Sequence, residues 1–114
     1  MRQYDIYRVD LDPTIGSEIG KMRPCLIISD DAFGALPSKI IAPITGWNPS
    51  FVDKPWMIKV NPSKENGLSK ISSIDCYQLN SVDISRFKEK LGSIEPFYID
   101  FLHEILGDLF SLPI

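Results

Sequence analysis

The sequence predicts a mainly β protein, a small antiparallel barrel of about five strands with a C-terminal α-helix. Short apolar segments alternate with turn signals rich in glycine, proline and asparagine over the first 94 residues, a pattern typical of small barrels. A helical period appears in the C-terminal segment instead. The length of 114 residues supports one domain, expected over residues 1–114.

The N-terminal elements follow from alternation and from proline. Apolar and polar residues alternate within 5–11, which predicts a half-buried strand. Pro13 cannot extend a strand ladder, so we expect the strand to end there and a loop to follow over 12–22. The apolar run within 23–29 predicts a strand buried on both faces.

The central elements are predicted from the same signals. The expected elements are a turn capped by Asp30 and Asp31 that runs through Leu36, a strand over 39–45 interrupted at Pro43, a loop over 46–55, strands over 56–60, 72–79 and 90–94, and a helical turn over 84–88. Trp56 heads one of these strands and is expected in the core.

The C-terminal segment begins with Pro96, which suits the first position of a helix. Large apolar side chains recur every four residues and are expected in the core: Phe97, Phe101, Ile105 and Leu109. Three acids are expected on another face: Asp100, Glu104 and Asp108. The segment therefore predicts an amphipathic helix with an acidic outer surface.

Composition excludes two classes of protein. Apolar residues make up 44% and charged residues 24%, which is not the composition of a disordered chain. The longest apolar run, Cys25–Ile28, is far shorter than the roughly 20 residues of a membrane-spanning helix. The N-terminus lacks the apolar region of a signal peptide, so we expect a cytoplasmic protein without a membrane partner.

The net charge of −3 weighs against a nucleic-acid binder when it is taken as a whole. Residues 95–114, however, hold four acids and no lysine or arginine. The other 94 residues hold 12 basic and 11 acidic groups. The acidity therefore belongs to the terminal segment, and the body is compatible with a local basic patch.

Two cysteines and one histidine limit the possible chemistry. Cys25 and Cys76 are expected to be buried, reduced thiols, because neither has a partner at metal-ligand spacing. His103 is the sole histidine, so a two-histidine acid–base pair and a His-rich zinc site are both excluded.

Residues 5–29 form the most informative segment. A predicted strand leads into a glycine-containing loop with Ser17, Glu18 and Lys21, and the loop leads to Arg23 at the start of a buried strand. An arginine on a strand is held rigidly and offers a planar fork to a phosphate group. The alternative is structural: the loop glycines serve tight turns, and Arg23 pairs with Glu18.

This segment closely resembles the MazF/PemK family of toxins from toxin–antitoxin pairs. The resemblance rests on Asp-Pro, Gly-Ser-Glu, a lysine and Arg-Pro, followed by an apolar strand that ends in serine. It continues through the motifs Ala42-Pro43-Ile44-Thr45, Asn66-Gly67-Leu68, Gln78, Ser81-Val82-Asp83, Arg86 and Leu91-Gly92. It therefore covers almost the whole chain.

The resemblance implies a compact SH3-like, CcdB-like barrel that forms a homodimer. It implies a metal-independent endoribonuclease that needs no cofactor, cuts single-stranded RNA at short sequence motifs, mainly messenger RNA, and so stops translation. It also implies a cognate MazE-like antitoxin that lays an extended acidic segment across the RNA-binding surface.

The resemblance also assigns roles to individual residues. Arg23 and Thr45 match the catalytic arginine and its Thr/Ser partner, and Glu18 matches a loop acid near the substrate. In metal-free cleavage the 2′-hydroxyl attacks the adjacent phosphate, and the enzyme must stabilise the extra negative charge. Arginine and hydroxyl donors suit that task. Arg23 stays protonated and is a poor base, so Glu18 is the candidate base, with a salt bridge to Lys21 or Arg23 as the alternative.

Six residues are candidates for RNA contact: Ser17, Lys21, Trp47, Tyr77, Gln78 and Asn80. Trp47 lies in the loop after Thr45 and offers a ring for base stacking, with core or dimer packing as the alternative. Tyr77 and Asn80 depart from the family pattern, which commonly has an acid before the glutamine and an arginine two positions after it. Sequence preference or activity is therefore expected to differ.

Two alternatives remain open. Tyr77 and Asn80 leave room for an RNA-binding module that cuts weakly or not at all. Gyrase-poisoning toxins share this barrel and act by binding protein through their C-terminal helix. Here the chain ends in a plain amphipathic segment with Leu112-Pro113-Ile114.

Overall fold

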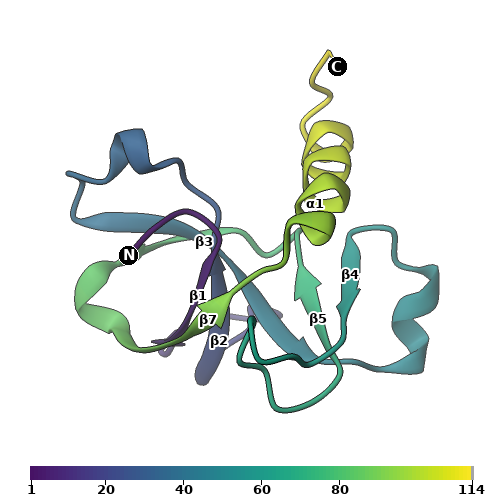
Figure 1. The fold of residues 1–114 in the computed structure, drawn as a ribbon, viewed down its shortest axis with the longest axis horizontal. Helices are drawn as coiled ribbons and strands as arrows, with labels where there is room; N and C mark the ends of the chain where they lie inside the picture. The colour runs from purple at the N-terminus through teal and green to yellow at the C-terminus, as the bar shows by residue number, and fades with distance from the viewer. Residues whose placement is uncertain (114) are drawn as a thin grey trace.

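The computed structural model describes residues 1–113, and within that range the chain forms seven strands, one α-helix and three short 3-10 helices (Figure 1). The strands are β1 (Asp5–Asp10), β2 (Met22–Ile27), β3 (Ser38–Gly46), β4 (Met57–Val60), β5 (Ser72–Asp75), β6 (Asn80–Asp83) and β7 (Phe87–Ser93). The helices are η1 (Asp31–Phe33), η2 (Pro49–Asp53), η3 (Ile84–Arg86) and α1 (Pro96–Leu109). Ile114, the last residue of the predicted domain, lies outside the described residues.

The prediction of a small antiparallel β structure with a C-terminal helix is confirmed. The strands pair in the order β4-β5-β3-β2-β1-β7, and β6 pairs with the first part of β3. Within residues 1–113 no pairing joins β4 to β7, so the curved sheet is not closed. The strand count exceeds five partly because the strand predicted over 72–79 ends at Asp75, and a further strand, β6, begins at Asn80. The Asp75 carboxylate accepts a hydrogen bond from Tyr77 N at 3.0 Å and turns the chain between β5 and β6.

The predicted double-sided burial of the second strand is confirmed. Leu26 packs in one hydrophobic cluster, and its neighbours Cys25 and Ile27 pack in another on the opposite face. Burial raises the pKa of the thiols of Cys25 and Cys76 to about 12, and both cysteines are free. These thiols therefore stay protonated and unreactive at neutral pH.

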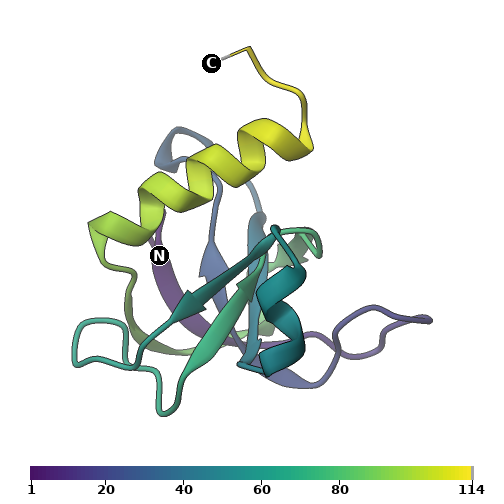
Figure 2. The same cartoon turned by 90° about the vertical axis from the view of Figure 1, so that its right-hand side faces the viewer.

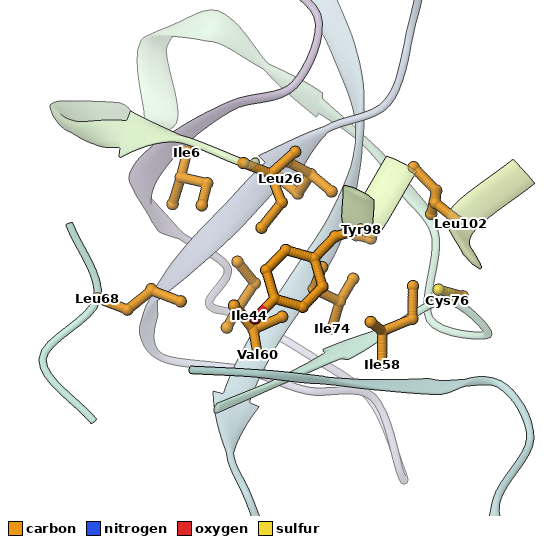
Figure 3. Close-up of a cluster of buried hydrophobic side chains, with 12 residues drawn as sticks. Ile6, Leu26, Ile44, Ile58, Val60, Leu68, Ile74, Cys76, Tyr98 and Leu102 are labelled. Carbon is orange, nitrogen blue, oxygen red and sulfur yellow. The ribbon is translucent and has the colours of Figure 1, made fainter. Parts of the chain in front are cut away.

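The larger cluster holds α1 against the sheet (Figure 3). One row of paired residues on β3, β5 and β4 points into it: Ile44, Ile74 and Ile58. Tyr98 and Leu102 are the buried side chains of α1 that meet this cluster. The prediction that Phe97 and Phe101 lie in the core is wrong, since they are 56% and 55% exposed.

The displacement of the two phenylalanines has a simple reason. The buried stripe of α1 starts one position later than predicted, at Tyr98, and continues through Leu102 with Ile105 and Leu109 half-buried. The acidic side chains of α1 are exposed, as predicted. Among the described residues, no helix is long and apolar enough to span a membrane.

Asp5 gives the fold a pH dependence. Its carboxylate accepts hydrogen bonds from Arg2 N at 3.0 Å and Ser93 Oγ at 2.8 Å and lies 3.4 Å from Lys90 Nζ. Burial raises the pKa of Asp5, but the two hydrogen bonds and the Lys90 charge outweigh it, so the net shift is downward. A carboxyl group with a lower pKa in the folded state stabilises the fold above its unfolded pKa, and this contribution is lost as pH falls through the folded pKa.

We therefore expect wild type to have a higher urea unfolding midpoint than Asp5→Asn, with the largest difference at neutral pH. It should shrink as pH falls below about 4, the ordinary range of an aspartate. Urea titrations at several pH values measure this difference. A difference that stays constant from neutral to acidic pH would contradict the assignment to Asp5.

Candidate active site

A cleft of about 260 Å³ opens where β2 and β3 meet the loop between β4 and β5. The charged side chains that line it are Arg8, Arg23 and Lys70, and no carboxylate of the described residues is among them. Hydroxyl groups of Thr45, Ser69 and Ser72 belong to the same lining. The cleft therefore presents cations and hydroxyl donors, which is the arrangement that binds a phosphate group.

Arg23 and Thr45 lie together in this cleft. Arg23 is on β2, and its Nε donates to Gly20 O at 3.0 Å, which orients the guanidinium. The Nη1 of Arg23 then donates to Thr45 Oγ1 at 3.4 Å. Thr45 is the last residue but one of β3 and pairs with Ser73 of β5, so both members of the pair are held by strands.

Gly20 lies in a position with no room for a side chain, which explains why a glycine is present there. A Cβ at Gly20 would lie 2.6 Å from Asp12 Oδ1. The same Asp12 Oδ1 accepts a hydrogen bond from Lys21 N at 2.7 Å, which closes the base of the loop over 12–21. The carbonyl that orients Arg23 is therefore fixed by the closure of this loop, which projects from the body of the molecule (Figure 2).

Lys70 is a site residue that sequence reasoning missed. Its Nζ lies 3.2 Å from the position that a Cβ would take at Gly46, so the ammonium group lies over the backbone next to Thr45. The pairing of Gly46 with Ser72 brings this segment to the cleft. No local motif predicts this register. Lys70 could have been predicted as a site residue only from the pairing of β3 with β5. Arg8 was likewise missed; it lines the cleft and pairs with Glu89.

Glu18 lies apart from the cleft. Its Oε1 accepts a hydrogen bond from Ile15 N at 2.7 Å, and Glu18 lines a separate cavity of about 60 Å³ with Gln78 and Asn80. In the part of the chain that the structure describes, no ion pair joins Glu18 to Lys21 or Arg23.

Of the six predicted RNA-contact residues, Asn80 shares the small cavity with Glu18, and the other five fall into three groups. The amide of Gln78 donates to Ser17 O at 3.4 Å, so the loop over 12–21 meets the segment between β5 and β6. Lys21 is exposed at the base of the loop. Trp47 and Tyr77 belong to an aromatic surface beside the cleft and do not line it.

The other ionisable groups lie elsewhere. His103 is on α1, and its Nε2 is 2.8 Å from the hydroxyl oxygen of Tyr4. Burial raises the pKa of Asp75, although hydrogen bonds from Tyr77 N and Gln78 N and the Lys54 charge oppose this. Across residues 1–113, no three His, Cys, Asp or Glu side chains form a group that could hold a metal ion. The lining of the cleft offers charge stabilisation by Arg23, Lys70 and Thr45.

Comparison with known proteins gives consistent matches. A family model described as PemK-like, MazF-like toxin of type II toxin–antitoxin system matches residues 2–110. Endoribonuclease MazF of Staphylococcus saprophyticus is 39% identical over 92 residues, which cover 80% of this chain and 75% of that protein. A probable endoribonuclease MazF of Mycolicibacterium smegmatis is 35% identical over 95 residues, 82% of each chain.

Solved structures show the same fold at lower identity. MazF from Deinococcus radiodurans superposes with a TM-score of 0.81 at 21% identity and covers 98% of this chain and 97% of its own. A mycobacterial endoribonuclease in complex with its cognate antitoxin gives a TM-score of 0.78 at 17% identity, covering 100% of this chain and 98% of its own.

Proposed function

The chain belongs to the family of PemK-like, MazF-like toxins of type II toxin–antitoxin systems, and we propose that the Arg23 cleft is its active site for cleaving single-stranded RNA without a metal ion. Relatives at 39% and 35% identity carry the name endoribonuclease, which supports this activity. The observation that carries the assignment to this cleft is the contact of Arg23 Nη1 with Thr45 Oγ1 at 3.4 Å, beside the ammonium group of Lys70.

The proposed reaction breaks one P–O bond and forms another. The 2′-hydroxyl of the nucleotide attacks the adjacent phosphorus, the bond to the 5′-oxygen breaks, and a 2′,3′-cyclic phosphate and a 5′-hydroxyl result. The nonbridging oxygens gain negative charge on the way. Arg23 and Thr45 donate hydrogen bonds to these oxygens, and Lys70 adds a positive charge, so the transition state is stabilised more than the bound substrate.

Two protons must move in this reaction. The 2′-hydroxyl loses one to the base, and the leaving 5′-oxygen gains one from solvent water. Arg23 stays protonated and acts as a donor. We assign Glu18 as the base, which requires its carboxylate to leave Ile15 N and enter the cleft when RNA binds. Residues 12–18 of the loop are exposed, whereas Ile19 packs against a buried cluster, so the movement is confined to the part of the loop before Ile19.

The remaining predicted residues contact the RNA on either side. Ser17, Lys21, Gln78 and Asn80 are proposed to bind bases or phosphates at the loop, and Trp47 and Tyr77 to stack on bases. We further propose that the toxin acts as a cytoplasmic homodimer, that messenger RNA is its substrate, and that a cognate MazE-like antitoxin neutralises it. A related endoribonuclease has been solved with its cognate antitoxin, which supports the last point.

Thr45 provides the test of this proposal. Purified protein is incubated with long single-stranded RNA and excess chelator, and initial cleavage rates are compared among variants. Loss of one such donor typically costs about 100- to 1000-fold in rate, so we expect that loss for Thr45→Val and substantial recovery for Thr45→Ser. RNA that is bound but not cut by wild type would contradict the proposal and indicate a binding module. Inhibition of gyrase without RNA damage would indicate a protein-binding toxin.

A further inference from the structure

Four aromatic rings and two lysines form a continuous surface beside the cleft. This aromatic–lysine strip consists of Lys59, Trp47, Phe51, Lys54, Trp56 and Tyr77. It begins where Lys59 Nζ lies 5.0 Å from the Trp47 ring centroid, and the Trp47 ring meets Phe51 edge-on with centroids 5.7 Å apart.

The second half of the strip continues from Phe51. Lys54 Nζ bridges two rings, at 5.6 Å from the Phe51 centroid and 6.0 Å from the Trp56 centroid. Trp56 in turn lies 6.1 Å from Tyr77, which is 70% exposed. The other three rings are half-buried. The prediction that Trp56 lies in the core is therefore wrong, because its ring lies on this surface.

Strand register connects the strip to the cleft. Thr45 pairs with Ser73, and Ser73 pairs with Lys59, so the three side chains lie in one row across β3, β5 and β4. The neighbouring row is the buried isoleucine row, so this one faces the opposite side of the sheet. Trp47 follows Thr45 by two residues, and its ring lies near Lys59 Nζ, on the side of the sheet that Lys59 faces. The strip therefore starts beside the proposed catalytic threonine.

We propose that the aromatic–lysine strip binds the single-stranded RNA that flanks the scissile phosphate, an inference that rests on the proposed function of the cleft. Bases stack on the rings, and Lys54 and Lys59 pair with phosphates along the same path. Proteins that bind single strands without strict sequence readout combine aromatic platforms with a cationic track in this way. The strip holds two cations, and Asp75 near Lys54 is buried. Two exposed acids of α1 border the strip, Glu104 in a groove with Lys59 and Asp108 in a groove with Trp56.

This arrangement predicts that substrate length determines affinity. An RNA that covers only the cleft contacts Arg23, Thr45 and Lys70, whereas a longer RNA also gains the rings. Stacking contributes about 1–3 kcal/mol per base, so removing one ring is expected to weaken binding of a long RNA about 10-fold. Removing one lysine is expected to lower the salt dependence of binding by about 0.7 in logarithmic slope.

The two tryptophans of the chain, Trp47 and Trp56, both lie in the strip, so intrinsic fluorescence reports on it directly. An Arg23→Ala background slows cleavage by about 100- to 1000-fold, so that the RNA stays largely intact during the titration. Oligouridylates of about 4 and about 12 nucleotides are titrated into this protein and into Trp47→Phe and Trp56→Phe versions. We expect both tryptophans to be quenched by the longer oligonucleotide and only weakly by the shorter one.

Binding is then measured by anisotropy for Trp47→Ala, Tyr77→Ala and Lys54→Ala on the same background. Phe33→Ala and Lys64→Ala are the matched controls, because these residues are exposed and lie outside the strip. Strip variants should lose affinity for the long RNA and keep that for the short one, while the controls keep both. Sedimentation of each variant checks that its oligomeric state is unchanged.

Three outcomes would overturn the inference. The first is that strip variants bind long RNA as tightly as the controls do. The second is that the loss of affinity among the variants follows dissociation of the dimer. Quenching by polyglutamate but not by RNA would assign the strip to an acidic protein partner. Failure of the proposed function would give a different result: the wild-type protein would bind long RNA through the strip but would not cleave it.

Discussion

Replacing Arg23 by alanine is expected to lower the rate of RNA cleavage by about 100- to 1000-fold. The Nη1 of Arg23 contacts Thr45 Oγ1, and Gly20 O orients the guanidinium, so the side chain is held before substrate arrives. A preorganised donor stabilises the charge that develops on the phosphate without reorganisation during the reaction. Arg23→Lys keeps the charge but loses the planar guanidinium, and we expect its cleavage rate to remain far below that of wild type.

Initial rates on long single-stranded RNA in excess chelator measure this effect. Arg2→Ala is the matched control, because Arg2 is an exposed arginine that pairs with Asp31 away from the cleft. The control should cleave at the wild-type rate. Urea midpoints of all variants should agree, which separates a loss of chemistry from a loss of folding. Wild-type rates for Arg23→Ala would show that the reaction takes place elsewhere.

Asn66→Ala is expected to destabilise the fold by about 3 kcal/mol or more. The side chain of Asn66 is fully buried and makes four hydrogen bonds. Its Oδ1 accepts from Ser63 N and Leu68 N, each at 3.0 Å, and its Nδ2 donates to Asn61 O at 2.9 Å and Glu95 Oε1 at 3.0 Å. Each buried partner left unsatisfied costs about 1–3 kcal/mol.

Asn66 also connects stability to the site, because the loop that it holds carries Lys70 into the cleft. We therefore expect Asn66→Ala to lower cleavage under conditions where the variant is still folded. Asn61→Ala is the control, since the Asn61 side chain is exposed and its carbonyl serves Asn66. The control should change the unfolding free energy by less than about 0.5 kcal/mol. Equal unfolding curves for the two variants would contradict the role of this network.

Local patterns predicted the elements that depend on local chemistry. The both-face burial of Leu26 and its neighbours follows from an apolar run, and the position of α1 follows from a 3.6-residue period after Pro96. The same period misplaced Phe97 and Phe101, because two overlapping apolar stripes on α1 differ by one residue. Only the contact of the helix with the isoleucine row decides between them, and that contact is tertiary.

The site shows the same division. The family pattern predicts Arg23 and Thr45 as site residues, and strand pairing brings their side chains together. Lys70 and the aromatic–lysine strip depend on the register of β3, β5 and β4, which no motif specifies. The net charge of −3 was likewise a poor guide. The exposed acids of α1 account for that charge, whereas the described residues that line the cleft carry cations.

The most direct test of the central claim is the chemistry of the RNA ends produced in excess chelator. Cleavage by 2′-hydroxyl attack in the Arg23 cleft must leave a 2′,3′-cyclic phosphate, or the 3′-phosphate to which it opens, and a 5′-hydroxyl. We expect these ends from wild type, and a loss of the same cuts with Arg23→Ala. Products with a 5′-phosphate and a 3′-hydroxyl, or cuts that disappear when the chelator is added, would contradict the account.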